Sequence, residues 1–338
     1  MNSDRKLTQP KPQSIGLAML SAALLLVLLL TIALSLSQGS VSLSWGDLWQ
    51  ALLRRGNPVN QTIIWELRLP RIAAAGIVGS ALGLSGALMQ GMLRNGLADP
   101  YLLGISAGAG LVAVLMVILG VFTAYIPLAA WMGAIVTTIV VYLLSRTASG
   151  ISLDRLILGG VAVNSLLGAI QTTLLLLADE GRIQRALNWL VGSLNGRGWA
   201  EVNAVAGYLA IGLILGCLMA RSLNALNLGD ELAIGLGVSL GRSRLLIGGI
   251  ATLLAASAVS VAGLIGFVGL VVPHGVRLLV GTDYRWVLPL SAIGGAIVLM
   301  FADLLSRLGT VELPVGAVMA LLGSPLFIAL LYQRDRVR

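Results

Sequence analysis

The sequence predicts an all-α protein, a polytopic transmembrane bundle of about ten helices, because the chain is rich in apolar residues and poor in charge. Apolar residues make up 57% of the 338 residues and charged residues 11%, with a mean hydropathy of +0.95. Soluble domains carry about 25% charged residues, so this chain has too few to cover a water-facing surface. Its 42 glycines also suit a membrane, where small residues let helices approach closely.

The first apolar run, 15–36, lies in a stretch without charge between Lys11 and Asp47. It is longer than the apolar core of a signal peptide, which has roughly 7–15 residues. It also reaches the roughly 20 residues that a helix needs to cross a bilayer. We therefore predict an uncleaved first helix that follows a cytoplasmic tail at 1–14.

Nine further apolar runs are expected to cross the membrane as helices, because a backbone in lipid must satisfy its own hydrogen bonds. The more polar stretch 40–71 is expected to hold a short interfacial helix with anchoring tryptophans, and the polar segment 180–202 to lie outside the membrane. We treat 1–338 as one transmembrane domain. The expected spans are 72–93, 101–121, 125–145, 155–178, 203–220, 244–262, 264–281, 287–305 and 315–332.

This arrangement places both chain ends in the cytoplasm and most of the 22 Lys and Arg residues on the same side, as the positive-inside rule expects. Arg54 and Arg55 fall outside, where contact with lipid headgroups explains them. The other outside arginines need a further reason, and an acidic partner on the outer face would supply one. These are Arg68, Arg71, Arg182, Arg185, Arg197 and Arg307.

The chain lacks the residues for nucleotide hydrolysis and for common enzymatic chemistry. Lysine occurs only at positions 6 and 11, so no G-x-x-x-x-G-K-[ST] phosphate loop exists and an ATP-driven role needs a separate ATPase. With His274 and Cys217 as the single histidine and cysteine, we expect no metal site and no catalytic activity. The net charge of +8 reflects basic residues between spans, so we expect no nucleic-acid binding.

Asp303 is the main candidate for an ionisable group inside a span, and such groups mark ion-coupled secondary transporters. It lies near a predicted helix end with Arg307 one turn further on. An ion pair at i, i+4 accounts for it without proton coupling. Ion-coupled secondary transport stays the alternative to an ATP-driven role.

Short polar motifs follow one another from about residue 60 to the C-terminus. They are Leu67-Arg68-Leu69-Pro70-Arg71, Gly86-Ala87-Leu88-Met89-Gln90-Gly91, Arg94-Asn95-Gly96-Leu97-Ala98-Asp99-Pro100, Leu103-Gly104-Ile105-Ser106-Ala107-Gly108, Gly192-Ser193-Leu194, Leu228-Gly229-Asp230-Glu231, Gly266-Phe267-Val268-Gly269-Leu270-Val271-Val272-Pro273-His274, Glu312-Leu313-Pro314-Val315-Gly316 and Gly323-Ser324-Pro325-Leu326-Phe327. Their ordered set closely resembles the permease family of type II ABC importers for ferric siderophores, haem and cobalamin. Two departures from that family are present: Gly96 stands where proline is usual, and the segment 323–327 replaces the commoner G-A-P-F-F.

The resemblance implies the type II importer permease architecture in a bacterial inner membrane, with a second permease copy or a paralogue around a shared pathway. Two ABC ATPase subunits, which bind ATP and Mg, would dock from the cytoplasm. A periplasmic or lipid-anchored substrate-binding protein would dock outside. The implied cargo is an iron chelate, with ferric siderophore ahead of haem and cobalamin, and this chain itself would carry no cofactor.

The resemblance also assigns roles to residues at the two faces of the membrane. Arg68, Arg71 and Arg307 would receive glutamates of the binding protein, since guanidinium stays charged and binds carboxylate in a bidentate way; lipid headgroup contact is the alternative. The segment 222–242 would form the coupling helices for the ATPase, with a solvated loop as the alternative. Its expected contact residues are Leu228, Gly229, Asp230, Glu231, Ala233, Leu236 and Gly237.

A third group would close the pathway on the cytoplasmic side. Asn95 and Leu97 follow the second span, and Ser152 and Leu153 precede the fifth. All four could equally be ordinary turn formers. Gln90 and Asn164 would either line the pathway or, as we favour, form hydrogen bonds between helices.

Overall fold

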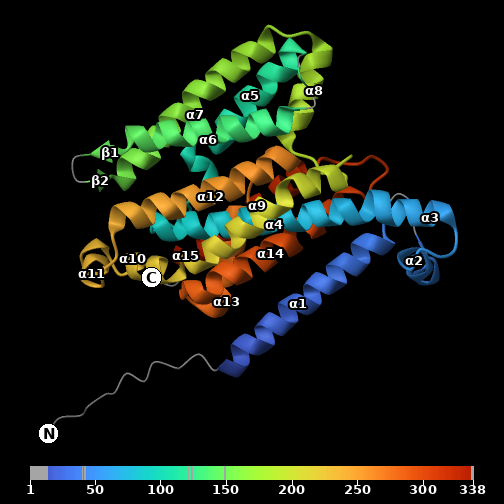
Figure 1. Cartoon of the computed structure of the whole chain (residues 1–338), viewed down its shortest axis with the longest axis horizontal. Helices are drawn as coiled ribbons and strands as arrows, with labels where there is room; N and C mark the ends of the chain where they lie inside the picture. The colour runs from blue at the N-terminus through green and yellow to red at the C-terminus, as the bar shows by residue number, and fades with distance from the viewer. Residues whose placement is uncertain are drawn as a thin grey trace.

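The computed structural model describes residues 14–39, 41, 43–120, 122, 125–147 and 150–335. Apart from Ser14, where the first helix begins, the predicted tail 1–14 lies outside the described residues. Long helices lie side by side along most of the chain, and α5, α6 and α7 form a layer beside the others (Figure 1).

The predicted all-α fold is confirmed. Within the described part of the chain, seven helices are long and apolar enough to cross a membrane, and three shorter apolar helices occupy the remaining predicted spans. The ten elements are α1 (Ser14–Ser37), α4 (Leu69–Met92), α5 (Ile105–Leu119), α6 (Ile126–Leu144), α7 (Leu153–Leu176), α9 (Trp199–Leu218), α12 (Leu240–Ala262), α13 (Val268–Val280), α14 (Tyr284–Ser306) and α15 (Val315–Asp335).

The prediction for 40–71 is only half right. The short α2 (Trp45–Leu52) forms where a short interfacial helix was expected, and Trp45 and Trp49 are exposed on it. The following α3 (Pro58–Thr62) and the π-helical turn η1 (Ile63–Arg68), however, run without a break into α4 as one helix, Pro58–Met92. The wide turn explains why: Leu69 donates its backbone N–H five residues back to Ile64, and this extra residue makes room for the ring of Pro70, which has no N–H to donate.

The connections between the spans hold short elements. Of these, only α8, in the polar segment 180–202, and α10 and α11, in the predicted coupling segment 222–242, fall where the sequence suggested. The α13 helix begins later than predicted because Gly263 and Phe267 adopt φ of 71° and 68°. The short elements are η2 (Pro100–Leu103), the strands β1 (Arg146–Thr147) and β2 (Gly150–Ile151), α8 (Glu180–Val191), α10 (Ala220–Asn227) and α11 (Asp230–Gly235).

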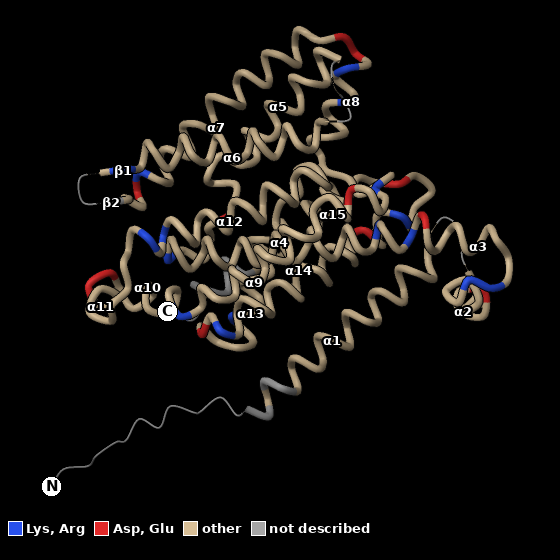
Figure 2. Tube along the Cα trace, viewed as in Figure 1, with Lys and Arg blue, Asp and Glu red and all other residues tan. Residues whose placement is uncertain are grey.

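The apolar helices run alternately between two ends of the molecule. At one end, which we call the α11 end, lie α10, α11, the β1–β2 hairpin and the loop after α4; the start of α1 and the end of α15 lie there too (Figure 1). At the other, the α2 end, lie α2, α3 and the loops 192–198 and 307–314. Charged residues gather at these ends and around α8, with apolar helix between them (Figure 2).

The centre of the bundle is α4, almost all of whose residues are buried against α14, α12, α13 and α9. Its packing depends on glycine. A Cβ atom on Gly79 would lie 2.2 Å from the carbonyl oxygen of Gly295 in α14, and a Cβ on Gly295 would lie 2.1 Å from the carbonyl oxygen of Gly79. Backbone therefore meets backbone at this crossing, as small residues allow in membrane bundles.

We expect Gly79→Val to prevent most of the chain from folding, because the two helices would have to separate along their whole contact. Overpacking usually costs about 1–3 kcal/mol, and more where only backbone could yield. The measurement is the yield of monodisperse protein and its melting temperature in detergent. Gly207→Val on α9 is the control, since a Cβ there meets nothing within 4 Å. Equal yields of the two variants would contradict the account.

Candidate functional site

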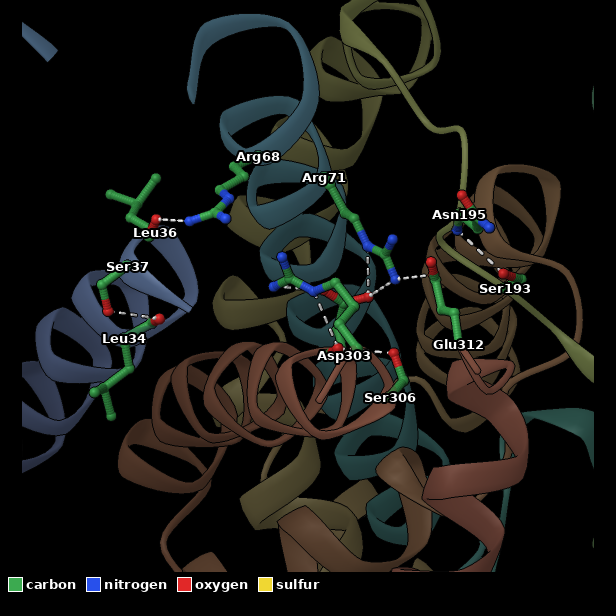
Figure 3. Close-up of polar contacts among 11 residues, drawn as sticks. Leu34, Leu36, Ser37, Arg68, Arg71, Ser193, Asn195, Asp303, Ser306 and Glu312 are labelled. Carbon is green, nitrogen blue, oxygen red and sulfur yellow. Dashed lines mark hydrogen bonds and ion pairs between the residues drawn. The ribbon is translucent and has the colours of Figure 1, made fainter. Parts of the chain in front are cut away.

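At the α2 end, Arg71 and Arg307 share one buried carboxylate, Asp303, which is 1% exposed. Figure 3 shows Arg71 between Asp303 and Glu312. The Nε of Arg71 donates to Oδ1 of Asp303 at 2.8 Å, and its Nη2 lies 2.6 Å from Oε1 of Glu312. Arg307 reaches Oδ2 of Asp303 at 3.1 Å from the same helix. The predicted i, i+4 pair of Asp303 and Arg307 is thus present, and Arg71 extends it to α4.

Arg68 lies beside this group but is bound differently. Its guanidinium donates to the backbone carbonyls of Leu36 and Val41, and the residue is 5% exposed. Leu36 is in the last turn of α1, whose carbonyls have no partner within the helix. Arg68 therefore fastens the end of α1 to the start of α4 (Figure 3).

These arginines face a cavity of about 480 Å³, which we call the outer cavity. Among the described residues, its wall carries four arginines, Arg68, Arg71, Arg197 and Arg307, and two carboxylates, Glu66 and Glu312. Buried Asp303 pairs with Arg71 and Arg307 without lining the cavity, so the four guanidinium groups outnumber these three carboxylates by one. The cavity thus brings the three predicted docking residues together.

The sequence reasoning did not single out Arg197 for this site. Burial lowers the pKa of Arg197, and nearby Glu201 opposes the change. Its Nε has no hydrogen-bond partner among the described residues. The one sequence feature that pointed to Arg197 was its place among the arginines predicted to lie on the outer side of the membrane.

At the α11 end, Asp230 is the centre of an ion-pair network. Its two carboxylate oxygens accept from Nη2 of Arg244 at 2.9 and 2.8 Å, and Oδ1 lies 3.2 Å from Nη2 of Arg94. Arg244 also donates to the carbonyl of Ile151 at 3.4 Å. Asp230 therefore joins α11 to the loop after α4 and, through Arg244, to the hairpin before α7.

The exposed face of α11 is apolar. Leu228 and Leu236, both predicted contact residues, are 59% and 64% exposed, and Leu232 and Ile234, which the prediction omitted, are each 60% exposed. Ala233 faces the core and is fully buried. The exposed Glu231 provides a charge at the edge of this face.

Two glycines fix the shape of this segment. Gly229 precedes α11 with φ of 110° and Gly237 follows it with φ of 81°. Residues with a side chain rarely adopt these values, whereas glycine does so readily. Glycine therefore stands where the chain turns at each end of α11: Gly229 belongs to the quoted motif, and Gly237 is one of the predicted contact residues.

The predicted gate residues lie in two loops beside this network. Asn95 accepts a hydrogen bond from the backbone of Leu97 at 2.9 Å, which closes a turn. Ser152 caps α7 and accepts from the backbone of Arg155 at 3.4 Å, and Leu153 is partly buried against the core. Each loop therefore contains a turn former whose chain neighbour, Arg94 or Ile151, belongs to the network.

Gln90 and Asn164 both form hydrogen bonds between elements. Gln90 donates to the carbonyls of Gly269 and Leu270 at 3.0 and 3.2 Å and is 2% exposed, so it joins α4 to α13. Asn164 donates from α7 to the carbonyl of Tyr101 at 3.2 Å. Its Oδ1 has no hydrogen-bond partner within the described part of the chain.

Comparison with known proteins gives consistent matches along nearly the whole chain. Residues 25–333 match the FecCD transport family. The hemin transport system permease protein HmuU of Yersinia pestis is 39% identical over 325 residues, 93% of this chain and 96% of its own length. The cobalamin import system permease protein BtuC of Halobacterium salinarum is 42% identical over 277 residues, 81% of this chain and 74% of its own.

A solved structure agrees with these sequence matches. A metal-chelate type ABC transporter in an inward-facing conformation superposes with a TM-score of 0.86 and 30% identity, covering 94% of this chain and 99% of that one. The type II importer permease architecture is therefore confirmed, and ion-coupled secondary transport is no longer supported as the alternative. The chain is a polytopic membrane permease that belongs to the FecCD transport family.

Proposed function

We propose that this chain forms half of the translocation pathway of an ATP-driven importer in a bacterial inner membrane, with both termini in the cytoplasm. The observation that carries the proposal is the α11 end, where an exposed apolar helix is tied through Asp230 to both predicted gate loops. A helix that moves under an external motor could pull on both loops at once. The α11 end then faces the cytoplasm and the α2 end faces outward.

The external motor is a pair of ABC ATPase subunits that bind ATP and Mg, since this chain has no nucleotide loop. Their docking surface is α11 with its flanking glycines, and an exposed group of apolar side chains is typical of a protein interface. Because Asp230 is held within the chain, the exposed Glu231 is better placed to pair with a basic group of the ATPase.

The outer cavity receives carboxylates of a periplasmic or lipid-anchored substrate-binding protein. An incoming glutamate would compete with Asp303 and Glu312 for the N–H groups of Arg71 and Arg307, while Arg197 offers a guanidinium without such an ion pair among the described residues. Arg68, whose guanidinium is held by backbone carbonyls, adds its positive charge to the cavity wall. The docking role of all four arginines rests on the excess of positive charge in this wall.

A second permease, either another copy or a paralogue, completes the pathway. Asn95, Leu97, Ser152 and Leu153 close it on the cytoplasmic side until α11 moves. The helix α7 suits a place beside the pathway because only 11% of its most apolar window is buried within this chain.

The cargo is an iron chelate, for which ferric siderophore is the first choice. Relatives named as ferric citrate, hydroxamate and enterobactin permeases support an iron cargo. Haem and cobalamin are the competing cargoes, because two of the relatives compared above are named for them.

Uptake in a deletion strain tests the proposal, with labelled ferric siderophores, haem and cobalamin supplied in parallel and the intact gene restored as a control. We expect uptake of a ferric siderophore to fall at least tenfold and to return on complementation. Loss of haem or cobalamin uptake instead would reassign the cargo. Normal uptake of every compound in a strain without a second importer would contradict the proposal.

A further inference from the structure

Two adjoining cavities form a long groove on the side of the bundle, between α6 and α12. The cavity nearer the α11 end has a volume of about 880 Å³, and the next, about 660 Å³, also touches α9. Trp131 and Leu253 line both cavities, so the two meet at these side chains. Helix α12 rises roughly 17 Å from Arg242 to Leu253, close to one leaflet of a hydrocarbon core about 30 Å thick.

The groove wall is apolar even where polar residues line it. Thr138 and Thr252 donate their hydroxyl groups to carbonyls of their own helices at 2.9 and 2.8 Å. Trp131 donates its indole N–H to the hydroxyl of Ser257 at 3.1 Å. Since these donors are already satisfied, the wall offers mainly methyl, methylene and aromatic surface to its occupant. Glu201, the one carboxylate among its described lining residues, lies in the second cavity, away from the two arginines, and accepts from the backbone N–H of Gly198 at 2.9 Å.

The α11 end of the same groove is positively charged. Arg146 and Arg242 line it and are exposed, and neither forms an ion pair with a described residue, unlike Arg94 and Arg244, which pair with Asp230. Helix α12 starts here with no acidic residue in its first turn and no side-chain cap at Ser239. Its free backbone N–H groups and its dipole add to the attraction for an anion.

We propose that this groove binds one anionic phospholipid, with an acyl chain between α6 and α12 and the phosphate held by Arg146 and Arg242. Guanidinium groups bind phosphate through paired N–H donors, and basic residues at a membrane surface each favour anionic lipid. A zwitterionic lipid could fill the apolar part but would gain less from the two arginines. The proposal is independent of the cargo. With the proposed orientation, which places the α11 end in the cytoplasm, the bound lipid belongs to the cytoplasmic leaflet.

The test is native mass spectrometry of the full-length protein in detergent, titrated with phosphatidylglycerol and with phosphatidylcholine of the same acyl chains. We expect one phosphatidylglycerol molecule to bind at least tenfold more tightly than phosphatidylcholine. The double variant Arg146→Gln, Arg242→Gln should lose about tenfold in phosphatidylglycerol affinity. The matched control is Arg221→Gln, Arg285→Gln, which removes the same charge at the same end from residues that line a different cavity.

A second variant tests the apolar part. Gly249 lines the groove, and a Cβ there meets nothing within 4 Å, so Gly249→Leu should fill the groove without disturbing the fold. We expect it to weaken both lipids at least fivefold, whereas Gly207→Leu, also in open space but outside the groove, should not. Equal affinity for the two lipids, or equal losses in a test variant and its control, would overturn the proposal.

Discussion

Asp230→Asn is expected to uncouple transport from ATP hydrolysis while the protein remains folded in the membrane. Asparagine keeps the size of the side chain but removes the charge that holds Arg244 and Arg94. Hydrogen bonds to charged groups contribute about 1.5–3 kcal/mol each to stability. Because the Asp230 side chain is 36% exposed, we expect its hydrogen bonds to lie at the lower end of that range. That is enough to free α11 from both gate loops without unfolding the bundle.

The measurement is the number of ATP molecules hydrolysed for each cargo molecule imported by the assembled transporter. We expect this ratio to rise about tenfold in Asp230→Asn. Asp230→Glu should restore part of the coupling, because it keeps the charge. Glu180→Gln, at an exposed acid on α8 away from the network, is the control for a loss of one negative charge. A normal ratio in Asp230→Asn, with the protein at wild-type level, would show that the network does not transmit the movement.

Arg71→Glu is expected to have the second large effect, and it acts on both stability and docking. The new carboxylate would face Asp303 and Glu312 at the positions where Arg71 now pairs with both. Breaking a buried ion pair costs about 3–5 kcal/mol, because a charge remains without its partner. We expect a lower melting temperature in detergent and no measurable binding of the substrate-binding protein.

Arg197→Glu separates docking from stability. Arg197 lines the same cavity and has nearby Glu201 but no ion pair with a described residue, so its reversal should lower the melting temperature much less than Arg71→Glu does. Affinity for the substrate-binding protein should fall about tenfold at low ionic strength, and the difference should shrink as salt screens the charges. Arg55→Glu, at the same end but outside the cavity, is the control. Wild-type affinity in Arg197→Glu would remove the outer cavity as the docking surface.

The sequence predicted features that depend on neighbouring residues. Apolar runs locate the spans, because the composition of a segment determines whether it can cross the membrane as a helix. The pair of Asp303 and Arg307 follows from their separation of one helical turn. The π-helical turn before Pro70 was missed because the composition of 40–71 is too polar for a span, although the helix continues through it.

Features that join distant segments could not be predicted. Arg71 and Asp303 are 232 residues apart in the chain, and nothing in either local sequence indicates that α4 and α14 cross at that height. The sequence likewise contained no sign that Asp230 pairs within the chain, so we expected it to contact a partner protein. Its pairing with Arg94 and Arg244 exists only once α4, α11 and α12 are assembled. The family motifs pointed to these loops, and the assembled structure decides which of their side chains face inward.

The most direct test of an ATP-driven permease is transport by the purified chain, assembled with its ABC ATPase in proteoliposomes and supplied with the substrate-binding protein and a labelled ferric siderophore. We predict accumulation that requires ATP on the α11 side and stops when the ATPase carries a substitution that prevents hydrolysis. Accumulation driven by a proton or sodium gradient, without ATP, would contradict the account.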